Sequence, residues 1–248
     1  MQIVMFKNSI DLNVNTKGVK MRTTVKMIKR CIFFSFIFLS LAYYFSVHHM
    51  ENPEQSFFKG IPDDFLTSIC SGIFASLLVV ILCELSRYQS LKSDVEQRIY
   101  DTNLRLFTTL GLIKQILKRC INKKIGANEL NDLDDFVKNF LKYKDELDLI
   151  EYTTFCNNKN SFSNKFKNYK AKLITEQEIF DAKYKLDDVK NDIKKQPAVI
   201  NTILDNVNLI FKMVDRSNTT LDEYCDKRFE FEGLKEEYRK VGFLMPDD

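Results

Sequence analysis

The fold of this chain is decided by two uninterrupted apolar stretches, CIFFSFIFLSLAYYFSV at residues 31–47 and FLTSICSGIFASLLVVILC at residues 65–83. Neither stretch contains a formally charged side chain. A helix rises about 1.5 Å per residue, so roughly 17 to 25 apolar residues cross the hydrocarbon core of a bilayer. Because lipid offers backbone groups no hydrogen-bond partners, we expect both stretches to cross the membrane as helices. Two buried helices of a soluble domain are the alternative, and such helices rarely stay uncharged for so long.

The charges around the two stretches predict their orientation. Residues 1–30 carry seven Lys or Arg and one acidic residue, whereas the loop at residues 48–64 carries four acidic residues and Lys59 as its only Lys or Arg. Because Lys and Arg are retained in the cytoplasm, both termini should be cytoplasmic in a multi-pass protein. A cleaved signal peptide is the competing interpretation of the first stretch. Ser46-Val47-His48-His49, however, offers no small-x-small cleavage site.

The remainder, residues 84–248, is long enough for one cytosolic domain. Seven Gly, four Pro and no Trp in the whole chain favour helices over sheets. The predicted class is all-α. A basic cytosolic segment (residues 1–30) precedes a transmembrane hairpin (residues 31–83), which continues by a long helix into a cytosolic helical bundle (residues 84–248).

An apolar stripe predicts that long helix. Its members recur at steps of three, four and four residues, a period of 3.67 residues per turn. They are Tyr88, Leu91, Val95, Ile99, Thr102, Leu106, Leu110, Ile113, Leu117 and Ile121. Extended backward, the stripe meets Glu84 at the inner membrane boundary, so one helix of roughly 55 to 60 residues would couple membrane to cytosol. Lys123, Lys124 and Gly126 are expected to end it.

Four more helices are expected beyond it. The second begins at Asn131 or Asp132 and ends near Phe155, followed by a loop at residues 157–161. The third covers residues 163–196, and the fourth begins with Pro197 in its first turn and reaches about Val214. Ser217 or Thr219 would cap the fifth.

Catalytic and metal chemistry finds little support in the residues. The only histidines, His48 and His49, lie in the predicted outer loop, which excludes a cytosolic His base, a Ser-His or Cys-His pair and a His-containing metal site. The chain has no P-loop, G-x-G-x-x-G or H-E-x-x-H pattern. Its six Cys include no C-x-x-C pair and suit reduced thiols. We therefore predict no enzymatic activity, no metal and no cofactor.

Charge is unevenly distributed along the cytosolic part. Residues 84–125 carry nine basic and four acidic side chains, residues 129–151 carry three and eight, and residues 152–174 carry five lysines and no acid. In the last block rings alternate with lysines, a pattern that single-stranded nucleic acid could use. The candidate contacts to a partner or nucleic acid are Lys165, Phe166, Lys167, Tyr169, Lys170 and Lys172. The simpler alternative is that this block packs against the acidic helix, with its rings in the core.

Small residues mark one face of each predicted span. Ser68, Gly72 and Ser76 recur at every fourth position, and Ser35, Ala42 and Ser46 follow one another at steps of seven and four. Small-xxx-small faces permit close approach of membrane helices. Either the two faces pack together within one hairpin, or they also meet other copies and build a homo-oligomer.

Three classes of function are compatible with this layout. The first is a membrane-perturbing effector that its cytosolic domain holds inactive. The second is a passive anchor or adaptor that binds a partner through its cytosolic helices. The third is a sensor subunit that reads external conditions through the outer loop, which is too short for a folded ligand domain.

In layout, the chain resembles the two-transmembrane effectors of bacterial anti-phage defence systems, particularly retrons. The likeness comprises two N-terminal spans, a helical cytosolic remainder, no catalytic motif and a Lys-, Asn- and Ile-rich composition typical of AT-rich coding. It implies a toxin of the bacterial inner membrane that a reverse transcriptase and its RNA–DNA hybrid keep silent. The segment around Lys165–Lys172 would then meet that ribonucleoprotein.

Overall fold

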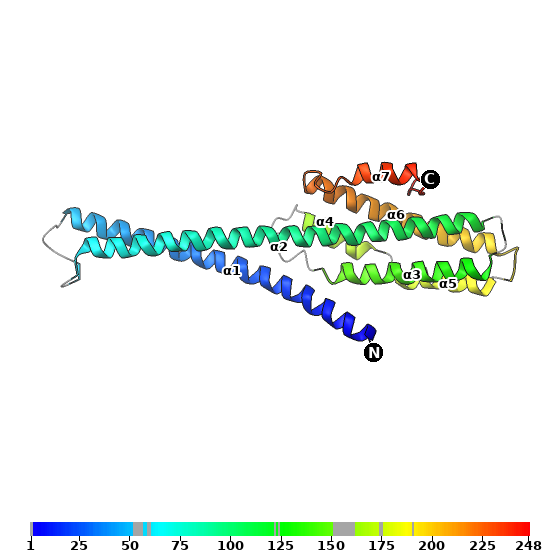
Figure 1. Ribbon diagram of the computed structural model, residues 1–248, viewed down its shortest axis with the longest axis horizontal. Helices are drawn as coiled ribbons and strands as arrows, with labels where there is room; N and C mark the ends of the chain where they lie inside the picture. Colours follow the sequence, from blue (N-terminus) through cyan, green and yellow to red (C-terminus); the bar gives the residue numbers. More distant parts are fainter. Residues whose placement is uncertain are drawn as a thin grey trace. The chain divides into compact units, whose positions relative to one another are not determined.

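The computed structural model describes residues 2–51, 57–58, 61–121, 123, 125–150, 162–173, 176–189 and 191–248, with side chains from residue 23 onward except those of 163, 176–180 and 182. Every regular element within these ranges is a helix, which confirms the predicted all-α class (Figure 1). The helices are α1 (Gln2–Glu51), α2 (Asp63–Cys120), α3 (Ala127–Asp148), α4 (Phe162–Lys172), α5 (Glu176–Val189), α6 (Gln196–Tyr224) and α7 (Phe231–Lys240). The chain divides into two compact units, residues 1–94 and residues 95–248, each described by itself below.

The first unit contains two long apolar helices. Residues Thr23–Glu51 of α1 and the helix α2 each contain a window long and apolar enough to cross a membrane, with mean hydropathies of 1.7 and 2.4, and α2 continues beyond residue 94 into the second unit. The backbone is already helical from Gln2, so the basic segment before the first span belongs to α1. The two helices meet where Ala42 and Phe45 of α1 pack against Cys70 of α2.

The predicted continuous helix is confirmed as α2, which runs for 58 residues without a break. Within the second unit its apolar stripe is buried, because the other helices of that unit cover it. Ile99, Leu106 and Leu110 are fully buried, and the ring of Phe107 packs against that of Phe211 of α6 at 4.7 Å. α6 also packs against α4, α5 and α7, and α3 packs against α5. The core of the second unit therefore lies between α2 and α6.

Several predicted helix boundaries are wrong in the middle of the chain. α3 begins at Ala127, earlier than predicted, and Gly126 is the N-cap of α3 in an extended conformation rather than the residue that ends α2. The predicted third helix is two helices, α4 and α5, on either side of Leu173, whose backbone leaves the helical path. α3 ends at Asp148, with Leu149 as its C-cap, so the end predicted near Phe155 is wrong as well. The loop predicted at residues 157–161 lies outside the described residues.

The predicted fourth helix and the first part of the predicted fifth form one helix, α6, and the rest of the predicted fifth, which was expected to include Leu234, falls in a turn and in α7. Pro197 lies in its first turn, as predicted. Neither Ser217 nor Thr219 is an N-cap: the Thr219 hydroxyl donates to the Asp215 carbonyl oxygen one turn earlier, a bond that leaves the helix intact. The helix is interrupted later, by a turn at residues 225–230. There Asp226, Lys227 and Glu230 adopt positive φ values of 54°, 57° and 52°.

Candidate functional site

Two histidines near the end of α1 lie against two carboxylates at the start of α2, at the turn between these helices in the first unit. His48 Nδ1 lies 2.7 Å from Asp63 Oδ2, and the backbone N–H of Phe57 donates to Asp63 Oδ1 at 2.9 Å. The hydrogen bond from Phe57 and then that from His48 lower the pKa of Asp63. His49 lies 3.4 Å from Asp64. Both histidines therefore face carboxylates in the first turn of α2.

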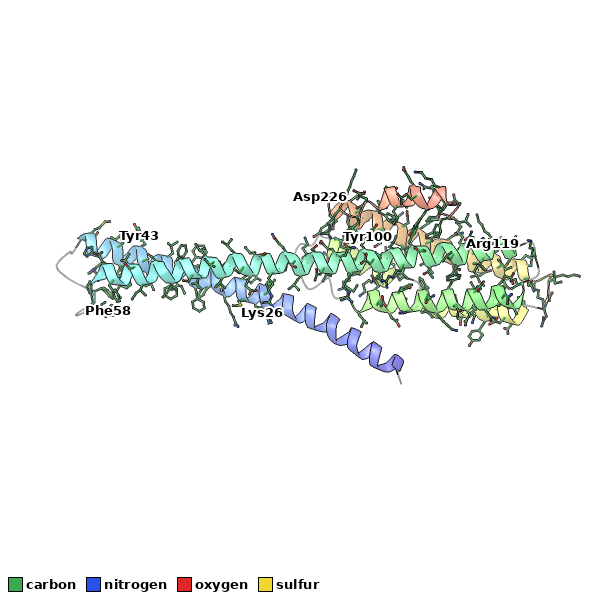
Figure 2. The ribbon with its side chains drawn as sticks, in the orientation of Figure 1. Lys26, Tyr43, Phe58, Tyr100, Arg119 and Asp226 are labelled. Atoms are coloured by element: carbon green, nitrogen blue, oxygen red, sulfur yellow. The ribbon has the colours of Figure 1, made fainter. Side chains whose placement is uncertain are left out.

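Aromatic rings surround this turn. The ring of Phe57 makes edge contacts with those of Tyr44, Phe45 and His48, at 5.6 to 5.8 Å between centroids. The ring of Phe58 packs on Phe57 at 5.0 Å (Figure 2). This arrangement suits the interface between a bilayer and water, where rings with a polar neighbour are favoured.

The small residues of the two spans have different surroundings. Ser35 and Ala42 of α1 are buried and Ser46 is half-buried, whereas Ser68, Gly72 and Ser76 of α2 are exposed. A Cβ atom built on Gly72 would meet no atom within 4 Å. The hydroxyls of Ser68 and Ser76 donate back to the Asp64 and Gly72 carbonyl oxygens of their own helix. Among the described residues, the face of Ser68, Gly72 and Ser76 is therefore uncovered.

The stripe predicted to couple membrane and cytosol changes along its length. Glu84 is half-buried; its Oε1 lies 3.5 Å from Arg87 Nη1, while its Oε2 has no hydrogen-bond partner. Tyr88 and Leu91 are half-buried. Val95, Ile99, Leu106 and Leu110 are buried in the second unit.

The predicted contact residues of α4 fall into two groups. Phe166 is 1% exposed, and the Tyr169 hydroxyl donates to Asn103 Oδ1 of α2 at 3.1 Å. Desolvation, followed by the charge of Asp148, raises the pKa of Tyr169. Lys170 donates to the Asp148 carbonyl oxygen at the end of α3, at 2.7 Å. These three side chains hold α4 in the unit, whereas Lys165, Lys167 and Lys172 are exposed.

A groove of about 580 Å³ runs between α4 and α6. Phe162 and Phe166 of α4 line its apolar floor with Leu209 and Met213 of α6. Four cations line it as well: Lys165, Lys172, Lys212 and Arg216. Lys167 does not line the groove, although it was predicted to contact a partner together with Lys165 and Lys172.

The contribution of α6 to this groove was not predicted from the sequence. Leu209, Met213 and Arg216 recur at steps of four and three, with Lys212 beside them, which puts apolar and basic side chains on one helical face. That pattern is a usable signal. A helix was predicted over residues 197–214, but no exposed face was assigned to it.

No metal centre is found in the part of the chain that the structure describes. No group of three or more His, Cys, Asp or Glu side chains there is arranged to hold an ion. Cys31, Cys70 and Cys120 are buried free thiols, and Cys156 lies outside the described ranges. In comparisons with known proteins, no family model, curated protein or solved structure matches this chain.

Proposed function

We propose that this chain is a non-enzymatic effector of the bacterial inner membrane that perturbs the bilayer when a cytosolic inhibitory partner releases it. The observation that carries the proposal is the large apolar surface of the two long helices. Phe33, Phe36 and Leu82 are 64%, 67% and 66% exposed. Exposed apolar surface on this scale marks a membrane or protein contact. Lipid is the medium that suits this apolar surface. Both termini of the chain would lie in the cytoplasm.

The uncovered face of Ser68, Gly72 and Ser76 supports assembly of the effector. Small side chains permit close packing between membrane helices, and this face has no partner among the described residues of its own unit. Other copies of the chain would occupy it in a homo-oligomer. Perturbation would then follow from the assembled spans, because no ionisable side chain lies mid-span to serve as an ion pathway in one copy.

The nature of the inhibitor follows from the resemblance to retron effectors and remains a prediction. Under it, a reverse transcriptase with its RNA–DNA hybrid binds the second unit and keeps the spans apart. Phage interference would remove that partner. A passive anchor or adaptor is the second candidate. The groove between α4 and α6 supports the anchor as well as it supports the effector, because both functions need a docking surface for a partner.

Expression of the chain without partners, followed with a membrane-potential dye, separates the two candidates. The effector should depolarise the inner membrane and halt growth. Gly72→Leu should relieve the toxicity by filling the small-residue face, while the span still inserts. Ser71→Leu, on a different face of the same helix, is the matched control and should stay toxic. An unchanged dye signal for the unaltered chain at full expression would favour the anchor.

A further inference from the structure

We infer that the groove between α4 and α6 is the docking site for an acidic amphipathic helix of a protein partner. The inference deepens the proposed function and rests on it for the existence of a cytosolic partner. Lys165 and Lys172 belong to α4 and Lys212 and Arg216 to α6, so each helix contributes two cations to an otherwise largely apolar groove.

The dimensions of the groove match a short helix. The lining residues of α6 run from Leu209 to Thr220 and those of α4 from Phe162 to Lys172. At about 1.5 Å per residue each wall is about 15 Å long, the length of about three helical turns. A helix laid in a groove of this kind anchors itself through apolar side chains at positions i, i+3 or i+4, and i+7. Leu209, which is 55% exposed, and Met213 offer such anchors an apolar surface.

The charge of the groove selects an acidic partner. No acidic side chain is among the described residues that line it. Lys212 does pair with Asp247 at 3.2 Å, but Asp247 is 87% exposed, and such surface pairs contribute little and exchange easily. Carboxylates on both flanks of an incoming helix would therefore face two cations on each side. Complementary charge of this kind sets partner choice and association rate.

The rings of the groove argue against a nucleic-acid strand in this place. Bases bind such proteins by stacking on exposed aromatic faces. Phe162 and Phe166 are 2% and 1% exposed and stack on each other at 5.7 Å, and the hydroxyl of Tyr169 is bonded to Asn103. The two phenylalanine rings therefore present almost no face to a base, which leaves the half-buried ring of Tyr169 as the one aromatic side chain with some exposed surface among the described residues that line the groove. The phosphates of a strand would find cations here, but among these residues its successive bases would find a single half-buried ring and no row of exposed rings to stack on.

The test measures binding to the full chain in detergent micelles by fluorescence anisotropy. The probe is a labelled model helix with Leu at the anchor positions and Glu on both flanks. Its two comparisons are the same peptide with each Glu replaced by Lys and a labelled oligothymidine. We expect the acidic helix alone to bind, more weakly as salt rises, because rim charges are screened within about 10 Å at 0.1 M salt.

Matched variants locate the binding. Lys165→Glu and Arg216→Glu should each weaken binding of the acidic helix by at least about fivefold, because each reverses one charge of the rim. Lys167→Glu lies two residues from Lys165 on the same helix but does not line the groove, and it should change binding less than twofold. Leu209→Ser should weaken binding, while Val241→Ser, at a still more exposed apolar position outside the groove (80% against 55%), should not.

Several results would overturn the inference. These are no binding of the acidic helix, equal weakening by Lys165→Glu and Lys167→Glu, or tight binding of oligothymidine that Lys165→Glu abolishes. Helical circular dichroism shows that each variant is folded. Depolarisation by the unaltered chain would leave the proposed function standing even if the peptide does not bind, so the two proposals fail separately.

Discussion

The backbone N–H of Phe231 donates a hydrogen bond of 2.9 Å to the Oδ2 atom of Asp222. The second carboxylate oxygen of Asp222 accepts from the backbone N–H groups of Phe229 and Glu230, at 2.9 and 3.0 Å. One buried carboxylate at the end of α6 thus satisfies the donors that begin α7. The ring of Phe229 stacks at 4.3 Å on that of Tyr100 of α2, close to the turn that contains Asp226 (Figure 2).

Asp222→Ala should release α7 from the second unit. Three backbone donors, one of them buried, lose an ionised acceptor, so the free energy of unfolding should fall by about 3 kcal/mol. Asp205→Asn, at an exposed position of the same helix, is the control and should change it by less than about 0.5 kcal/mol. Urea unfolding of the full chain in micelles, with hydrogen exchange of residues 231–240, measures both. Unchanged protection of α7 in Asp222→Ala would contradict the assigned role.

Gly111 is required where the ring of Phe243 packs on α2. A Cβ atom at Gly111 would lie 2.0 Å from Cζ of that ring, so Gly111→Ala must displace it. We expect Gly111→Ala to cost about 1 to 3 kcal/mol of stability in the unaltered chain. In a Phe243→Ala background the same change should stabilise by about 1 kcal/mol, because Ala is the better helix former. A double-mutant cycle by urea unfolding checks the change of sign; equal effects in both backgrounds would refute the contact.

The ion pairs of Asp134 predict an acid-sensitive contact between α3 and α5. Hydrogen bonds from Lys138 and then Lys183 lower the pKa of Asp134 below its ordinary value of 3.8. Because the folded pKa is the lower one, the stabilisation is complete above about pH 5 and is lost as the pH falls through the folded pKa. Its size should be about 0.5 kcal/mol, since the group is partly exposed.

Asp134→Asn should remove this acid-dependent component. In this variant the protection of residues 183–189 against hydrogen exchange, corrected for the intrinsic exchange rate at each pH, should stay constant as the pH falls. Asp132→Asn, two residues earlier at an exposed position of α3, should keep the loss of protection at low pH. The same acid response in both variants would show that Asp134 is not its source.

Phe74→Arg tests whether α2 enters lipid. A mid-span Arg costs about 2.5 to 3.5 kcal/mol on the translocon scale, so this variant should fail to insert or should aggregate. Phe74→Leu keeps the apolar character and should insert normally. Extraction of membranes with alkaline carbonate distinguishes the outcomes. Full retention of Phe74→Arg in the membrane fraction would overturn the assignment of the span, and so would solubility of the unaltered chain without detergent.

Helix existence was predictable, whereas helix ends in the second unit largely were not. The stripe from Val95 to Leu117 predicted a buried face because its period matches an α-helix, and that face is buried. The break after α6 was placed ten residues too early, because Ser217 and Thr219 have good capping side chains. The actual break depends on Asp222, whose hydrogen-bond partners lie seven to nine residues further along the chain.

The candidate site was predictable only in part, because the surroundings of its residues depend on other helices. Lys165, Phe166, Lys167, Tyr169, Lys170 and Lys172 look equivalent along the sequence, as basic and aromatic residues in alternation. Their surroundings separate them. Lys170 contacts Asp148 of α3, Tyr169 contacts Asn103 of α2, and Lys165 faces Arg216 and Lys212 across a groove that residues of α6 complete.

The sequence by itself determined that this protein has an all-α fold and two long apolar helices, the second of which, α2, is nearly sixty residues long. Those properties follow from the length and periodicity of local segments, which set the solvent each helix face prefers. The tertiary structure alone decided where α6 ends, which aromatic rings are buried and so cannot stack on a base, and which lysines share a groove. Each of these depends on side chains that lie far apart in the chain and meet only when the helices pack.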